Sequence, residues 1–201
     1  TLEEGDIINI PTGIFRGFEN IGSEYGMIMA ILGGDDAGGG VTWAPQVIED
    51  AAEHGLILGE NGRLYDSKKD ESLPSNIKPM PTLSEDALSK VPEPTAQSLI
   101  PRHVARYNDL MAFAANEPVK VIGKEGVLPD KPGFEVDFLT RLPDPTKTDK
   151  FGNSTVLMPM RGHWKLSWET GNVVLNPGDT CLLEPNFSHK IEPSVTGEAS
   201  L

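Results

Sequence analysis

Two features of this sequence invite a chemical interpretation at once: a lone thiol and a pair of neighbouring carboxylates. Cys181 is the one cysteine, so it can form neither an internal disulfide nor a zinc cluster. It stands in the apolar run 180–183, and we expect a buried, inert side chain rather than a nucleophile. Asp35 and Asp36 lie in a glycine-rich run that no Lys-Ser or Lys-Thr pair follows. A solvated turn is therefore a better interpretation of that run than a phosphate loop or a calcium site.

Aromatic side chains recur at strand spacing in the segment 163–169. Trp164, Leu166 and Trp168 alternate with polar residues there, which predicts a strand that carries all three on one face. We interpret this face as part of the core; the alternative is that Trp164 and Trp168 form a wall on which a ligand stacks. His163 belongs to the opposite alternation and should point away from that face.

The charge of the chain disfavours several classes of partner. Asp and Glu number 30 against 17 Lys and Arg, which gives a formal net charge of −13. Such a chain repels phosphate backbones and anionic lipids, so we expect neither nucleic acid nor membrane as a partner. No apolar run approaches the roughly 18 to 20 residues that span a bilayer, and the first residues lack a signal-peptide pattern. We therefore expect a cytoplasmic protein.

The N-terminal half combines strand, helix and linker patterns. A short amphipathic helix is predicted over 42–52, with a proline in its first turn and Gly55 after its end. Residues 60–95 are rich in charged residues, Ser and Pro, as in a linker along the surface. A second helix should run from about 101 to 115, opened by Pro101.

Two strands are expected before these helices. They cover 6–10 and 26–32, and the second is almost wholly apolar, as a strand buried on both faces would be. If that pair stood alone its edges would be unpaired, so we expect it to dock on the second half of the chain or on another chain.

The C-terminal half has the pattern of an all-β domain. Short runs of alternating polar and apolar residues are separated by turn residues, which is typical of a sandwich or a jelly-roll barrel. The predicted strands cover 119–122, 133–141, 154–160, 163–169 with a hairpin turn into 173–175, 179–183 and the residues after His189.

A repeated motif points to a family. The first copy has Gly5, Pro11, Gly13 and Asn20, with Arg16 three residues after the second glycine. This spacing resembles the second conserved motif of the cupin superfamily, in which a metal-binding His stands at the position of Arg16. A more divergent copy about 170 residues later begins at Gly178-Asp179, keeps the His as His189 and has other residues at the remaining positions.

The resemblance implies a metal site that this chain has largely lost. Cupin enzymes bind iron, manganese or another divalent metal, including zinc or nickel, through three His and a Glu. Thr155 stands at the Glu position when Gly162 is aligned as the end of the first motif, and 148–151 contains no His at the place of the His pair. His189 is then either a residual metal ligand or general acid/base, or a buried His held by hydrogen bonds. Arg16 either binds a carboxylate ligand or pairs with a nearby Glu within the chain.

These patterns together predict a mainly β protein: a cupin jelly-roll barrel with a helical linker and a partial first cupin. Residues 1–35 would be the C-terminal strands of the first cupin, 36–115 the linker with two short helices, and 116–201 the second barrel. The wider resemblance is to bacterial bicupins loosely related to gentisate and quercetin dioxygenases.

Three functions follow as hypotheses. The first is a cupin with a degenerate metal site that binds a small molecule, with Arg16, Trp164 and Trp168 as candidate ligand-binding residues. The alternative is a metal-dependent, dioxygenase-like enzyme that acts on a small acidic or aromatic substrate, with His189 as its metal ligand. A metal-free packing protein of the seed-storage kind is the third. Cupins commonly pair through their barrels, so the resemblance also implies a homodimer.

Overall fold

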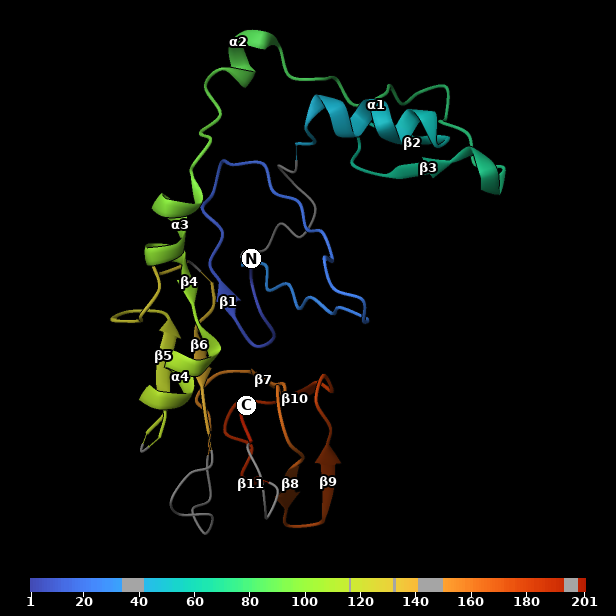
Figure 1. Cartoon of the computed structure of the whole chain (residues 1–201). Helices are drawn as coiled ribbons and strands as arrows, with labels where there is room; N and C mark the ends of the chain where they lie inside the picture. The colour runs from blue at the N-terminus through green and yellow to red at the C-terminus, as the bar shows by residue number, and fades with distance from the viewer. Residues whose placement is uncertain (34–41, 116, 132, 141–149, 194–198) are drawn as a thin grey trace. The chain divides into compact units, whose positions relative to one another are not determined.

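The structure is a computed structural model that describes residues 1–33, 42–115, 117–131, 133–140, 150–193 and 199–201 (Figure 1). Asp35, Asp36 and the segment 148–149 lie outside these residues, so the expectations for them stay predictions. The chain forms two compact units, one made of Thr1–Ile10 and Ala96–Leu201 and the other of Pro11–Thr95. This division differs from the predicted boundaries at 35 and 115, and the assignment of those parts to two cupins stays a prediction.

A helix and a hairpin are neighbouring elements in the unit Pro11–Thr95. The helix α1 (Pro45–Glu53) has a proline in its first turn and is followed by Gly55, whose φ of +79° lies in the left-handed region. This confirms the first predicted helix. After it, β2 (Leu56–Leu58) pairs with β3 (Leu64–Asp66), and the buried Leu58 and Tyr65 anchor the hairpin.

The predicted strand at 26–32 is wrong. The structure gives this segment no strand, and its apolar side chains, including Met27, Ile28 and Leu32, are exposed. A strand exists only where a neighbour satisfies its backbone N–H and C=O groups, and no described segment pairs with this one. The apolar composition alone therefore misled the prediction. Further along this unit come the short 3-10 helix η1 (Ser67–Lys69) and α2 (Glu85–Leu88).

The second predicted helix is replaced by two shorter ones. α3 (Ala96–His103) precedes the two-residue strand β4 (Val104–Ala105), and α4 (Tyr107–Phe113) follows it. Pro101 does not open a helix but lies inside α3, two residues before its end.

The unit made of Thr1–Ile10 and Ala96–Leu201 has two cores, and the first joins residues from both ends of the sequence. β1 (Ile7–Ile8) pairs with β4, and β5 (Val119–Ile122) pairs with β6 (Val136–Phe138). One cluster of buried apolar side chains packs between α4 and the β5–β6 pair, and Ile7 packs against it. The buried members are Tyr107, Leu110, Ala114, Val121, Ile122, Leu128 and Phe138.

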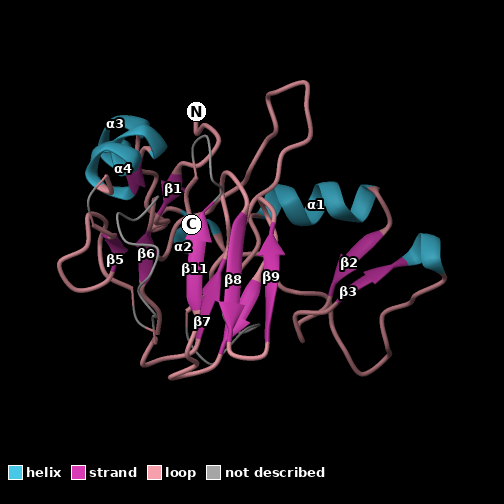
Figure 2. Ribbon diagram, turned by 90° about the horizontal axis from the view of Figure 1, so that it is seen from below, coloured by secondary structure: helices cyan, strands magenta, loops and turns pink. Residues whose placement is uncertain are grey.

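The second core lies between two antiparallel sheets at the C-terminal end. β7 (Thr155–Leu157) pairs with β10 (Cys181–Leu183). β8 (Trp164–Trp168) lies between β9 (Gly171–Leu175) and β11 (Lys190–Pro193), and Figure 2 shows these three strands side by side. The buried strand residues of this core are Leu157, Trp164, Leu166, Leu175 and Leu183, and Ala199 and Leu201 near the end of the chain belong to the same cluster. The predicted β9 hairpin and the strands around it are confirmed.

The fold is thus mainly β, made of small antiparallel sheets with a few short helices. The described strands form separate sheets of two or three strands and do not close into a barrel. None of the helices in the described ranges is long and apolar enough to cross a bilayer.

Candidate functional site

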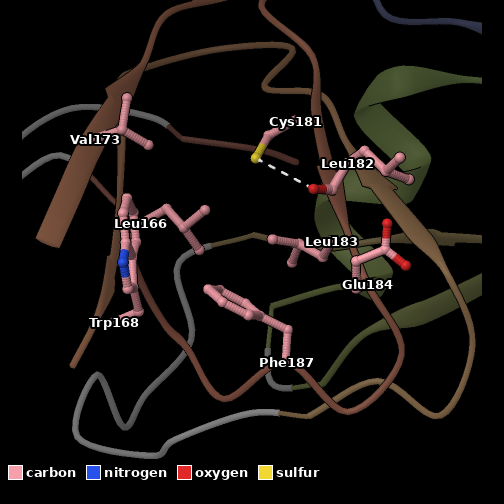
Figure 3. Close-up of a pocket in the computed structure, with 8 residues that line it drawn as sticks. All are labelled: Leu166, Trp168, Val173, Cys181, Leu182, Leu183, Glu184 and Phe187. Atoms are coloured by element: carbon pink, nitrogen blue, oxygen red, sulfur yellow. Dashed lines mark hydrogen bonds between the residues drawn. The ribbon is translucent and has the colours of Figure 1, made fainter. Parts of the chain in front are cut away.

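A groove of about 250 Å³ opens between the two C-terminal sheets. One wall comes from β8 and β9, and the other comes from β10 and the turn after it (Figure 3). Its lining is apolar apart from one thiol and one carboxylate. The lining residues are Leu166, Trp168, Val173, Cys181, Leu182, Leu183, Glu184 and Phe187.

Strand alternation explains which side chains face the groove. On β8, Leu166 and Trp168 share one face, and Val173 of β9 is directly opposite Leu166. On β10, Cys181 and Leu183 share a face and point toward that wall in Figure 3. The spacing of two that predicted the tryptophan strand therefore also positions the side chains of the groove.

Four rings gather at one end of the groove. Trp168 and Phe187 lie with ring centroids 6.2 Å apart, and both line the groove. The imidazole of His189 is nearly parallel to the Phe187 ring, at 13°, and the centroids of these two rings are 6.1 Å apart. Phe151 packs on the same imidazole at 5.1 Å. The histidine is thus next to two phenyl rings, one of which also borders the groove.

His189 is the polar residue of this aromatic cluster. It is only 1% exposed, and its Nδ1 lies 2.8 Å from the backbone oxygen of Phe187. Because a carbonyl oxygen can only accept, Nδ1 must carry the proton and donate it. The other ring nitrogen, Nε2, is buried without a hydrogen-bond partner among the described residues.

The structure separates the predicted site residues. Trp168 lines the groove and donates its Nε1–H to Thr170 Oγ1 at 3.0 Å. Trp164 is instead a core residue, with its Nε1–H directed to the Arg161 backbone oxygen at 3.3 Å. His163 is exposed, on the face of β8 opposite to Trp164, as the alternation predicts.

Arg16 belongs to the other unit, where it is exposed in an irregular segment. The expected alternative, an ion pair with a nearby glutamate, is absent from the described ion pairs of the chain. Arg16 is therefore not in the same unit as Trp168 and His189.

Cys181 and Phe187 are among the groove residues that sequence reasoning missed. Cys181 is half-buried and faces the groove, not fully buried as expected. The orientation of Cys181 could have been predicted from the strand pattern of 180–183, because Cys181 must share a strand face with Leu183. Phe187 follows β10 in a turn, where no periodicity indicates which way a side chain points.

The donors around His189 do not form a metal site. Within the described parts of the chain, no group of three or more His, Cys, Asp and Glu side chains is placed to hold a metal ion. Thr155, at the position where cupins carry a Glu ligand, donates its hydroxyl to the Asn153 backbone oxygen instead. The neighbours of the His189 ring are phenyl groups, which supply no ligand atom.

Comparison of the chain with protein-family models, with curated proteins and with solved structures found no match.

Proposed function

We propose that the C-terminal sheets bind a small, largely apolar molecule in the groove beside Trp168 and Phe187. The observation that carries this proposal is the groove itself, whose apolar walls include two aromatic rings and are left in contact with solvent. Small-molecule sites are typically concave and lined by apolar and aromatic side chains with a few polar groups. The volume of about 250 Å³ is ample, since a cavity of about 150 Å³ already binds benzene.

The finer features of the sequence interpretation belong to the same proposal. The strands β7 to β11 would be the larger part of a cupin-type jelly roll, and the groove would be the mouth of its interior. We also propose a cytoplasmic location and a homodimer, on the composition and on the resemblance described above. The short antiparallel strands of this part of the chain are the observation that supports the jelly-roll interpretation.

Two neighbouring valines give a matched test. Val173 lines the groove, whereas Val174 is exposed on the other face of β9. We expect 1-methylindole to shift the Trp168 indole N–H signal and the backbone amide signals of Cys181 and Phe187 in a proton–nitrogen spectrum. Val173→Phe should abolish these shifts by filling the groove, and Val174→Phe should leave them. Absence of shifts in the unmodified protein, or equal shifts in both variants, would overturn the proposal.

A metal-dependent, dioxygenase-like enzyme is the second candidate. It is favoured by one observation, the buried Nε2 of His189 without a hydrogen-bond partner, because an imidazole nitrogen is a common metal ligand. The donor set described above does not complete such a site, so we derive no catalytic step from it.

Elemental analysis separates the two candidates. The protein should be purified without chelator and without nickel affinity resin, and its iron, manganese, zinc and nickel measured. The binding proposal expects far less than one metal ion per chain. About one ion per chain in the unmodified protein, and none in His189→Phe, would favour the enzyme.

A further inference from the structure

We propose that the ligand of the groove is a neutral, planar molecule with one N–H or O–H donor, and that His189 Nε2 accepts this hydrogen bond. The inference rests on the proposed function and specifies the class of ligand. In this proposal the ring of Phe187 turns aside, and the ligand enters the space that it leaves, with its donor directed at Nε2 in the plane of the imidazole.

The unpaired nitrogen is the first step of the argument. A buried acceptor without a donor is unfavourable, and such atoms are rare enough in proteins that each needs an explanation. The two tryptophans on the same face of β8 both donate their N–H groups within the protein, as described above. His189 Nε2 is therefore the unsatisfied buried atom of this wall within the described residues.

The second step is the position of His189 relative to the groove. Ile191 of β11 is directly opposite Leu166, a residue of the groove wall. His189 is two residues before Ile191 and so lies on the same face of the sheet. One ring, that of Phe187, borders both the groove and the imidazole. Our proposal is that rotation of this side chain gives the ligand access from the groove to the imidazole.

The third step is the chemistry of the ligand. The lone pair of Nε2 accepts a hydrogen bond and gives nothing to a carboxylate or another pure acceptor. Glu184 lines the groove and is exposed, so an anionic ligand would meet a like charge there. Trp168 and Phe187 favour a flat ring. A neutral aromatic heterocycle or aromatic alcohol with one donor fits all three conditions.

Indole and 1-methylindole test the donor directly. They differ by one methyl group on the ring nitrogen, which removes the N–H donor. Calorimetric titration should give indole an affinity about three- to tenfold higher, as expected for one hydrogen bond. The advantage of indole should disappear in His189→Phe. It should persist in the matched control His163→Phe, which makes the same substitution at an exposed position.

The outcomes distinguish this inference from the proposed function. Equal affinities for both probes, or a preference for indole that survives in His189→Phe, would refute the role of His189 and leave binding in the groove intact. Failure of both probes to bind the unmodified protein would remove the proposed function and this inference with it.

A measurement on the unmodified protein avoids any question of whether His189→Phe folds. When histidine is labelled with nitrogen-15, nuclear magnetic resonance spectra contain ring-nitrogen signals from four side chains. We expect one of them to be the Nδ1–H tautomer, with an Nε2 signal that moves upfield on addition of indole and stays in place with 1-methylindole. An unchanged Nε2 signal at saturating indole would overturn the inference.

Discussion

Asp6 offers the sharpest test of how the ends of the sequence combine in one unit. Its carboxylate accepts hydrogen bonds from the backbone N–H of Tyr107, the first residue of α4, and of Glu3, both at 2.9 Å. It also pairs with the Arg106 guanidinium, and its side chain is only 3% exposed. Asp6→Ala would therefore remove the acceptor of several donors at the start of α4.

The expected loss of stability depends on whether each donor finds another partner once the Asp6 carboxylate is removed. The Glu3 N–H is at an exposed residue and the Arg106 side chain is 36% exposed, so water replaces much of what they lose. The Tyr107 N–H is at a buried residue and would keep no partner. A buried donor left unpaired costs about 1–3 kcal/mol, and a hydrogen bond to a charged group contributes about 1.5–3 kcal/mol. We expect Asp6→Ala to lower the free energy of unfolding by about 3 kcal/mol.

Glu4→Ala is the matched control. Glu4 is two residues away, its side chain is 80% exposed, and its ion pair to Arg161 is long at 3.6 Å. Exposed pairs of this kind contribute about 0–1 kcal/mol, so this variant should unfold almost as the unmodified protein does. Urea titration followed by circular dichroism measures both. A loss below about 1 kcal/mol for Asp6→Ala, equal to the control, would refute the view that residues 1–10 are integral to this unit.

The contribution of Asp6 should also depend on pH. Burial, the largest single influence, raises the pKa of this carboxyl, but the hydrogen bonds from Glu3, Tyr107 and Arg106 and the charge of Arg106 outweigh it and hold the pKa below 3.8. A carboxyl with a lowered pKa stabilises the fold fully above its unfolded pKa, and this stabilisation is lost as the pH falls through the folded pKa. The difference between Asp6→Ala and the unmodified protein should thus be constant above about pH 5 and shrink below pH 3.8.

Three further predictions concern the two units. Leu166→Ala should lower the free energy of unfolding by about 2–4 kcal/mol because the side chain is 2% exposed, whereas Leu182→Ala, at 62% exposed, should change it by less than about 0.5 kcal/mol in the same urea titration. Ile28→Ser should leave the thermal midpoint of unfolding unchanged, since Ile28 is 60% exposed. A drop of several degrees would instead support the buried strand predicted over 26–32. The hydrogen bond to Glu135 raises the pKa of Lys120, so Lys120→Gln should cost about 0.5 kcal/mol at pH 7 and less above pH 10.5, measured by urea titration at both values.

Three of the strands that sequence reasoning found share one physical property. In β7, β8 and β10, side chains that point to the core alternate with exposed ones. Where one face of a strand is buried against a core, alternation is enforced by burial and is therefore visible in the sequence. This explains why the strand 163–169 could be predicted to within one residue at each end.

The failures have a common cause in long-range contacts. The segment 26–32 has the composition of a buried strand, but composition does not specify a pairing partner. Conversely, the β2–β3 hairpin is short and lies in a charged region, and its stability depends on buried Leu58 and Tyr65. Neither result could be derived from local propensity, because strand formation depends on what the rest of the fold places beside it.

The same distinction applies to the candidate site. Alternation along β8 could identify Trp168 as a wall residue, but it could not separate Trp168 from Trp164, because both lie on one face. Their separation comes from depth: Trp164 is opposite Leu175 within the core, whereas Trp168 is at the end of the strand, opposite Gly171. A glycine leaves space where a larger residue would cover the ring, so the groove begins where the cross-strand neighbour of the tryptophan is small. His189 precedes β11 at this same end of the sheet, and in our proposal rotation of Phe187 exposes its unpaired nitrogen to a ligand of the groove.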